Sequence, residues 1–320
     1  MGTTATVLGA TGYSGGELLR LLAGHPDIDV LAVAGGARAG AHTEEVLPHL
    51  AGTGLAQVVT LDEGLGTGAD VCFSCLPSGV LPVEAVDAER VIDLSDDHRD
   101  DSDWVYGLTE FNREAISGAT FVANPGCYPT ASLLGLVPFV AAGVVEGPVV
   151  IDALSGVSGA GRKSDDRLSF ATAFGNATAY GDVDHRHVPE IERGLGSIAG
   201  TQPVVSFTPH LAPMSRGLLV TARARLTKEL TDEQALAVLE RSYGQEPFVH
   251  VVADWPSTKA VAGSNHAHVS ARVDRRAGFL VASAAIDNLG KGAAGQAVQN
   301  ANLCLGLVET TGLQGLGVWP

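Results

Sequence analysis

Residues 4–26, TATVLGATGYSGGELLRLLAGHP, carry the order of features that decides the fold of the N-terminal half. A β-rich run over residues 4–8 is followed by glycines at Gly9, Gly12 and Gly15 and then by leucines spaced for one face of a helix. This order is typical of a dinucleotide-binding unit, because the glycines let the backbone approach a pyrophosphate and the helix N-terminus favours an anion. The alternative is a glycine-rich turn that binds nothing.

The next strand indicates which dinucleotide this unit would bind. Residues 28–40, IDVLAVAGGARAG, contain no acidic residue at the strand end to bind ribose hydroxyls, and Arg38 follows instead. The pattern favours NADP(H), with Arg38 meeting the 2′-phosphate, although a solvated loop charge would look the same. The predicted cofactor-binding residues of this half are Gly9, Thr11, Gly12, Tyr13, Ser14, Gly15 and Arg38.

Strand-like and helix-like segments alternate through the rest of the first half. A strand over residues 70–77 is followed by a predicted helix over residues 78–89 and by strands over residues 90–95 and 120–127. This alternation predicts an α/β fold with a Rossmann-type doubly wound parallel sheet, whose ligand lies at the carboxyl ends of its strands.

The second half has a different pattern, with many strands and few helices. Its strand-like segments are residues 148–156, 203–211, 216–226, 266–274 and 278–287. A helix over residues 231–244 begins with a possible capping box of Thr231 and Gln234. We expect an α+β domain with a largely antiparallel or mixed sheet. The predicted division is an NADP-binding domain of residues 1–126 with 290–320, and a catalytic, substrate-binding and dimerisation domain of residues 127–289.

Composition excludes several classes of partner. The net charge of −16 would repel nucleic-acid phosphates, so no nucleic acid is expected. No apolar run reaches about 18 residues, so no membrane partner is expected, and the N-terminus has no basic leader, so a cytoplasmic location is expected. A reducing compartment predicts free thiols, and the Cys72–Cys75 pair is interpreted as structural because it falls in a buried strand.

Cys127 differs from the other cysteines in its surroundings. It lies in NPGCYPT, residues 124–130, between a Pro-Gly turn and a predicted helix that has Pro129 in its first turn. A helix N-terminus stabilises a thiolate, which is the nucleophilic form of cysteine. An inert buried cysteine is the alternative, but the nucleotide-binding pattern nearby favours catalysis.

The segment HRHVPEI, residues 185–191, supplies candidates for acid–base chemistry. His187 and Glu190 are three residues apart, so they share one face of a helix, and a carboxylate beside an imidazole orients it. His185 is the alternative acid–base residue. The H-x-H spacing could also build a zinc site with Cys127, but no further ligand spacing supports one, so no metal is expected.

Taken together, the motifs resemble those of the N-acetyl-gamma-glutamyl-phosphate reductase family along nearly the whole chain. The matching segments are residues 9–22, 91–99, 104–111, 124–130, 155–162, 185–191, 213–219, 263–269 and 287–303. This family reduces an acyl phosphate to an aldehyde with NADPH in arginine biosynthesis, and it is similar to aspartate-semialdehyde dehydrogenase in fold and chemistry. The resemblance implies that Cys127 is the nucleophile, that His187 and Glu190 with His185 alongside are its catalytic partners, and that Asn288 and Lys291 lie near the cofactor.

Further residues complete the expected site. Ser155 and Gly156 are expected to contact the cofactor. Candidates for the substrate's carboxylate and phosphate are Arg99, Asn124, Arg162 and Arg216, the arginines because their fork matches both anions. The expected partner is a small-molecule acyl phosphate, and the chain is expected to form a homo-oligomer, either dimer or tetramer. Three alternatives remain: an aspartate-type reductase, a carrier-linked substrate, and a nonenzymatic NADP sensor.

Overall fold

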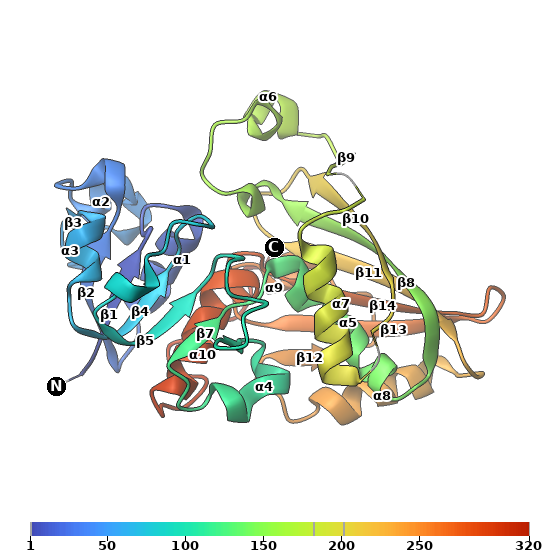
Figure 1. Cartoon of the computed structure of the whole chain (residues 1–320). Coiled ribbons are helices and arrows are strands. Elements are labelled where there is room, and N and C mark those ends of the chain that lie inside the picture. Colours follow the sequence, from blue (N-terminus) through green and yellow to red (C-terminus); the bar gives the residue numbers. More distant parts are fainter. Residues whose placement is uncertain (1, 182, 201, 320) are drawn as a thin grey trace. The chain divides into compact units, whose positions relative to one another are not determined.

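The computed structural model describes residues 2–181, 183–200 and 202–319. The chain forms two compact units, Met1–Gly126 with Ala293–Gln314, and Cys127–Gly292 with Gly315–Pro320 (Figure 1). Each unit has its own sheet. The expected combination of a Rossmann-type domain with an α+β domain is therefore confirmed.

The first unit contains a seven-stranded sheet in the order β3-β2-β1-β4-β5-β7-β6. Its strands are β1 (Thr3–Leu8), β2 (Ile28–Ala34), β3 (Val58–Val59), β4 (Ala69–Ser74), β5 (Ala88–Asp93), β6 (Val105–Tyr106) and β7 (Phe121–Ala123). Every pair of neighbouring strands is parallel. The order runs outward in both directions from β1 and β4, which is the doubly wound arrangement that places ligands at the carboxyl ends of the strands.

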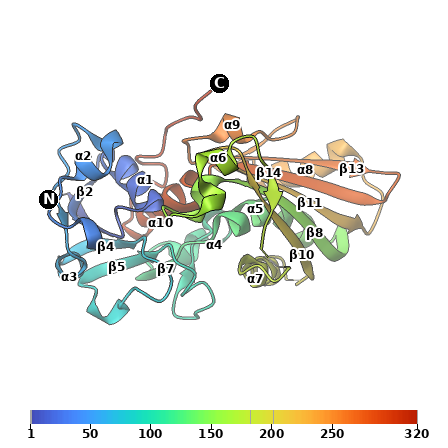
Figure 2. The ribbon, with the colours of Figure 1, turned by 90° about the horizontal axis from the view of Figure 1, so that it is seen from above.

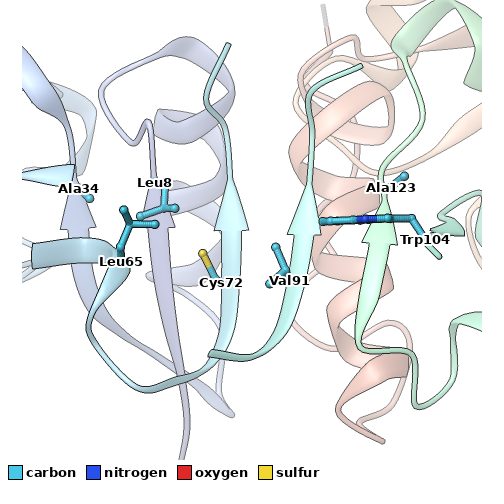
Figure 3. Close-up of a cluster of buried hydrophobic side chains, with 7 residues drawn as sticks. All are labelled: Leu8, Ala34, Leu65, Cys72, Val91, Trp104 and Ala123. Atoms are coloured by element: carbon cyan, nitrogen blue, oxygen red, sulfur yellow. The ribbon is translucent and has the colours of Figure 1, made fainter. Parts of the chain in front are cut away.

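Helices and apolar side chains cover this first sheet. The helices are α1 (Tyr13–Leu22), α2 (Thr43–Val46), α3 (Leu61–Leu65), α4 (Thr109–Ile116) and α10 (Gly295–Cys304). Leu65 of α3 belongs to a buried cluster with Leu8, Cys72, Val91 and other side chains of neighbouring strands (Figure 3). Cys72 is thus a packed core residue of β4, as the structural interpretation of the Cys72–Cys75 pair requires.

The predicted helix over residues 78–89 is wrong. The structure has only a short 3₁₀ turn, η3 (Val83–Ala85), and β5 begins at Ala88. Gly79 has a positive φ of 77°, and Pro82 lies at the N-cap of η3 in a non-helical conformation. A left-handed glycine and a proline within four residues break the helical hydrogen-bond ladder, and this outweighs the helix-forming residues that follow the proline.

The second unit contains a mixed seven-stranded sheet in the order β12-β13-β14-β11-β8-β10-β9. Its strands are β8 (Val145–Gly156), β9 (Thr178–Ala179), β10 (Val205–Ala212), β11 (Leu218–Leu226), β12 (Val249–Val251), β13 (Ala267–Asp274) and β14 (Phe279–Ile286). The pairs β10–β8 and β12–β13 are parallel and the others are antiparallel. The prediction of a mixed sheet is confirmed.

One helix of the second unit is apolar all round because it is enclosed. Helix α5 (Cys127–Ala141) packs against β11 and β14, and α7 (His187–Ala199) and α8 (Asp232–Tyr243) pack against α5 (Figures 1 and 2). Helix α8 begins with the predicted capping box, in which the Thr231 hydroxyl accepts from the Gln234 N–H and the Gln234 side chain accepts from the Thr231 N–H. Two short helices, α6 (Phe170–Ala173) and α9 (Thr258–Val261), complete the unit.

The C-terminal boundary differs from the predicted one. Of the predicted segment 290–320, residues 293–314, with α10, cluster with the first unit, whereas residues 290–292 and Gly315–Pro320 cluster with the second. Val318 N–H donates to the Ala262 carbonyl at 2.9 Å, and the Cα of Gly317 lies so close to Ala260 that a Cβ would meet its carbonyl. This backbone pairing, rather than an apolar pattern visible in the sequence, holds the segment.

Candidate active site

The glycine turn of the first unit has the geometry of an anion cradle. Gly9 has φ of 70°, and a Cβ there would lie 2.6 Å from the Cys75 carbonyl oxygen, so only glycine fits. A Cβ on Gly15 would lie 2.6 Å from Ala10, which shows how tightly α1 approaches the turn. Gly12 is the N-cap of α1 and provides no side-chain cap, so the helix N-terminus is open to a ligand. The turn therefore fits the pyrophosphate of a dinucleotide.

The other predicted cofactor residues of this unit surround the turn or follow it. Thr11 and Ser14 are half-buried and Tyr13 is 44% exposed, at the start of α1. Arg38 ends the 3₁₀ turn η1 (Gly36–Arg38), directly after β2, and is exposed. The guanidinium is thus accessible at the carboxyl end of the strand next to β1, where a 2′-phosphate would be recognised.

Cys127 is the first residue of α5, as the sequence predicts. Asn124, Pro125 and Gly126 connect the end of β7 to the start of α5, and Pro129 occupies the first turn of the helix. Gly292 lies directly against the cysteine: a Cβ on Gly292 would be 2.8 Å from the Cβ of Cys127. Cys127 therefore lies at a helix N-terminus and packs against the backbone of Gly292, where no side chain would fit.

His187 and Glu190 lie in the first turn of α7, both nearly buried at 5% and 4% exposure. The backbone N–H of His187 donates to Nδ1 of His185 at 3.2 Å, and the two rings are 4.9 Å apart. Because Nδ1 of His185 is an acceptor, a neutral His185 carries its proton on Nε2. The structure thus brings both histidines together.

A pocket of about 330 Å³ in the second unit contains these residues. Its lining includes Cys127, Tyr128, Ser155, Gly156, Lys163, Asp165, Arg167, Tyr180, His185, Arg186 and His187, with Asp165 paired to Arg167. Several lining groups are cationic, although the chain as a whole is strongly acidic. The pocket therefore offers a nucleophile, imidazoles and positive charge to an anionic ligand.

Sequence reasoning missed the tyrosines of this pocket. Tyr128 packs edge-on against His185 and His187, with ring centroids 5.9 and 5.8 Å away, and its hydroxyl is 2.9 Å from that of Tyr180. Tyr128 directly follows Cys127, a position that could have drawn attention to it. Tyr180 lies 52 residues after Tyr128, in a stretch without a recognisable motif.

Ser155 and Gly156 end β8 and form one hydrogen-bonded cluster with two other loops. The Asn288 side chain accepts from Gly217 N–H at 2.8 Å and donates to Ser158 Oγ at 2.9 Å. Gly156 N–H donates to the Gly217 carbonyl. Asn288 thus joins the β8 end to the β10–β11 loop.

Arg216 lies in the same β10–β11 loop and forms an ion pair with Asp287, a fully buried residue. The guanidinium donates to both carboxylate oxygens, at 2.9 and 3.2 Å. The Asp287 carboxylate also accepts from the N–H groups of Leu289 and Gly290. Arg216 is therefore held by an internal partner. Arg162 is exposed and directly precedes Lys163, which lines the pocket.

Two predicted substrate residues of the first unit have internal partners. Arg99 donates to the Asn124 carbonyl at 2.9 Å and to the Leu94 carbonyl at 3.0 Å, and it pairs with Asp96. The Asn124 side chain donates to the Ala293 carbonyl and accepts from Asn300. Both residues hold the chain immediately before Cys127 in place.

The remaining thiols and possible metal ligands do not form a second centre. Burial raises the pKa of Cys72 to about 12 and also raises the pKa of Cys75, so both stay protonated. Among the described residues, no three or more His, Cys, Asp or Glu side chains are grouped to hold a metal ion. Within the same residues, no helix has the length and apolarity needed to span a membrane.

The fold and the site define a semialdehyde dehydrogenase-type enzyme. Residues 4–119 match the semialdehyde dehydrogenase NAD binding domain family, and residues 127–288 match the semialdehyde dehydrogenase dimerisation domain family. Aspartate semialdehyde dehydrogenase II from Vibrio cholerae, solved in complex with ASA, has the same fold, with a TM-score of 0.77, 20% identity, and coverage of 95% of this chain and 98% of that one.

Full-length relatives narrow this class. N-acetyl-gamma-glutamyl-phosphate reductase of Arthrobacter sp. strain FB24 is 44% identical, with 100% of both chains covered. The enzyme of that name from Moorella thermoacetica is 43% identical, with 99% of both chains covered. The chain belongs to the N-acetyl-gamma-glutamyl-phosphate reductase family, as its motifs predict, and it is an oxidoreductase with an NAD(P)-binding domain.

Proposed function

We propose that this chain catalyses the NADPH-dependent reductive dephosphorylation of N-acetyl-gamma-glutamyl phosphate to N-acetylglutamate semialdehyde, through a thioester on Cys127, in arginine biosynthesis. The observation that carries this proposal is the position of Cys127 at the start of α5, in a pocket lined by His185 and His187. Family membership supplies the substrate class, since the relatives are named for it.

The chemistry begins with the Cys127 thiolate. The sulfur attacks the acyl carbon, and the bond from that carbon to the phosphate oxygen breaks, so inorganic phosphate leaves and a thioester remains. Bound NADPH would supply the hydride that reduces this thioester. The resulting hemithioacetal oxyanion takes a proton or re-forms its carbonyl, and the C–S bond breaks to release the aldehyde.

His187 is the proposed acid–base residue, and Glu190 is the proposed carboxylate that orients it. Both lie in the first turn of α7 and are almost fully buried, so the imidazole has little freedom to rotate. His187 would donate a proton to the Cys127 sulfur as the C–S bond of the hemithioacetal breaks, and would take that proton back from the thiol to form the thiolate for the next cycle. His185, which lines the pocket and carries its proton on Nε2 when neutral, is the other candidate donor.

The glycine turn and Arg38 would hold NADPH, with Gly9, Gly12 and Gly15 around the pyrophosphate. Arg38 favours the 2′-phosphate because no acidic residue ends β2. Ser155, Gly156, Asn288 and Lys291 belong to the second unit and remain proposed cofactor neighbours through their place in the family motifs.

The positive groups of the pocket would bind the substrate anions. Lys163 lines the pocket and Arg162 precedes it in the chain, so we assign phosphate and carboxylate binding to these two residues first, and to Arg167, which pairs with Asp165, after them. Arg216 remains a candidate for substrate binding: Asp287 would hold its guanidinium in place while it contacts the substrate anion. We propose that Arg99 and Asn124 do not contact the substrate and instead hold the chain before Cys127 in position.

We propose that the substrate is the free N-acetyl compound rather than one attached to an acidic carrier protein. The chain has 36 acidic against 20 basic residues, so its average field would slow the approach of an acidic protein. A small dianion needs only the local cations of the pocket. Comparable turnover on free and carrier-linked aldehyde, or brisk turnover on the carrier-linked form alone, would contradict this choice.

For assembly we propose a homodimer formed through residues 127–288, because this range matches a dimerisation domain family. Sedimentation of the purified protein would test this, and a monomer at micromolar concentration would contradict it. A cytoplasmic location is proposed from the biosynthetic role.

The decisive experiment is reduction of NADP by N-acetylglutamate semialdehyde, measured with and without phosphate. We expect phosphate-dependent turnover that Cys127→Ser abolishes while the variant keeps its melting temperature, since a serine hydroxyl ionises far less readily. Phosphate-independent turnover, or more than a few per cent of activity in Cys127→Ser, would exclude the thioester route. A pure NADP sensor would bind the cofactor without any turnover.

A further inference from the structure

Two tyrosine hydroxyls lie next to each other in the Cys127 pocket. Tyr128 is 3% exposed and Tyr180 is half-buried, and their oxygens are 2.9 Å apart. Both side chains line the pocket with Cys127. The catalytic steps described above use neither hydroxyl.

The environment of the pair indicates the direction of its hydrogen bond. Either oxygen of the pair could donate, but Tyr128 is nearly fully buried while Tyr180 is half-buried, so we take Tyr128 as the donor and Tyr180 as the acceptor. The proton of Tyr128, the more buried phenol, then lies in the hydrogen bond between the two tyrosines. The Tyr180 proton is left to point elsewhere, and a phenol that accepts one bond becomes a better donor of the next.

The Tyr180 hydroxyl remains a donor at any pH at which the enzyme works. Burial raises the pKa of Tyr128 and of Tyr180, and the nearby Cys127 raises both further. A phenol that stays protonated adds no second negative charge beside the Cys127 thiolate. It can stabilise negative charge that develops on a neighbouring oxygen.

The backbone holds Tyr180 in place. Its N–H donates to the Pro209 carbonyl at 3.0 Å, directly after Ala179 of β9 pairs with His210 of β10. Its ring lies edge-on to His185 with centroids 6.1 Å apart. A donor fixed at both its backbone and its ring loses little freedom when it binds, which is the requirement for electrostatic preorganisation.

We propose that the Tyr180 hydroxyl donates a hydrogen bond to the acyl oxygen of the group on Cys127, the oxygen that becomes negative when thiolate or hydride adds. Tyr180 is then a catalytic residue, and Tyr128 is a positioning residue that orients its hydroxyl. This inference rests on the proposed thioester chemistry. It adds an oxyanion donor that the family motifs did not indicate.

The test compares Tyr180→Phe with Tyr128→Phe, each of which removes one hydroxyl and keeps its ring. We expect Tyr180→Phe to lower kcat about 100-fold with KM almost unchanged, the usual effect of removing an oxyanion donor. Tyr128→Phe should lower kcat about threefold, because Tyr180 keeps its proton and loses only its partner. Both variants should melt within a few degrees of the wild type.

Alkylation of Cys127 by iodoacetamide separates oxyanion stabilisation from an effect on the thiolate. We expect the same alkylation rate in Tyr180→Phe and wild type, since that reaction forms no acyl oxyanion. Four results would overturn the proposal: kcat of Tyr180→Phe above a third of wild type, equal losses in both variants, a melting temperature that falls as far as the activity does, or an alkylation rate that falls with kcat. If the wild type itself fails to turn over, the proposed function is wrong, whatever the tyrosine variants do.

Discussion

Gly292→Ala should damage catalysis more than stability, because the added methyl group meets the nucleophile. A Cβ on Gly292 would lie 2.8 Å from the Cβ of Cys127, and it would also be 3.2 Å from the Asp287 carbonyl oxygen and 3.3 Å from Ile286. Ordinary van der Waals contacts begin at 3.4 Å, so Cys127 and the backbone around Gly292 must separate by about 0.6 Å. The Gly292 N–H donates to the Asp287 carbonyl at 2.9 Å, so the turn resists moving and Cys127 shifts instead.

The size of the effect follows from this displacement. Misplacing a reacting group by about 1 Å costs about 100-fold in rate, so a shift of this size should lower kcat by about 10- to 100-fold. The strain of overpacking should cost about 1–3 kcal/mol in the free energy of unfolding. The assay measures kcat, the rate of Cys127 alkylation and the melting temperature on the same preparation.

Gly135→Ala is the matched control for this variant. Gly135 lies in the same helix as Cys127, and an added Cβ would be 3.7 Å from Ala284, which is ordinary contact. We expect this control to keep full activity and to gain up to about 1 kcal/mol of stability from helix propensity. Wild-type kcat and alkylation in Gly292→Ala would refute the reasoning, because the methyl group would then fit without moving the sulfur.

His187→Asn should lower kcat about 100-fold or more, as expected for lost acid–base catalysis; a mild effect there with a severe one in His185→Asn would reverse the assignment. NADPH should be preferred over NADH and Arg38→Ala should narrow that preference, so equal or better use of NADH in steady-state kinetics would show the 2′-phosphate assignment to be wrong. Burial and the neighbouring His250 lower the pKa of His266 to about 4; the unfolded chain therefore binds the proton first, and stability should fall as pH drops from about 6.5 to 4. In His266→Gln the free energy of unfolding should fall by about 1 kcal/mol less over this pH range, a figure reduced because the ring is partly exposed. Urea unfolding measures this, and a pH profile equal to that of the wild type would contradict it.

Local patterns in the sequence predicted the elements that carry the chemistry. The strand, glycine turn and helix of residues 4–26 appear as β1, the turn and α1, because each is decided by nearby residues. The start of α5 at Cys127 was predictable for the same reason, since a Pro-Gly turn and an early proline mark a helix N-terminus.

Other parts of the site depended on contacts that no local pattern shows. The hydroxyl pair of Tyr128 and Tyr180 joins α5 to the residue after β9, and it exists only because β9 pairs with β10. The C-terminal residues beyond Gln314 pair through their backbone, which leaves no mark on side-chain periodicity. These features required the tertiary structure.

The arginines show most clearly why chemistry alone was insufficient. A guanidinium matches a substrate phosphate and a carboxylate of the protein equally well, so residue type does not distinguish a binding group from an internal one. Arg216 finds its carboxylate on Asp287, 71 residues away, and Arg99 finds the Asn124 carbonyl 25 residues away. Lys163 lines the pocket with Cys127, and Arg167 lines it too but pairs with Asp165 at 2.8 Å, so it repeats the case of Arg216. Charge reversal at Lys163 should therefore raise KM for the acyl phosphate, whereas the loss of Arg99 should lower stability and leave KM nearly unchanged.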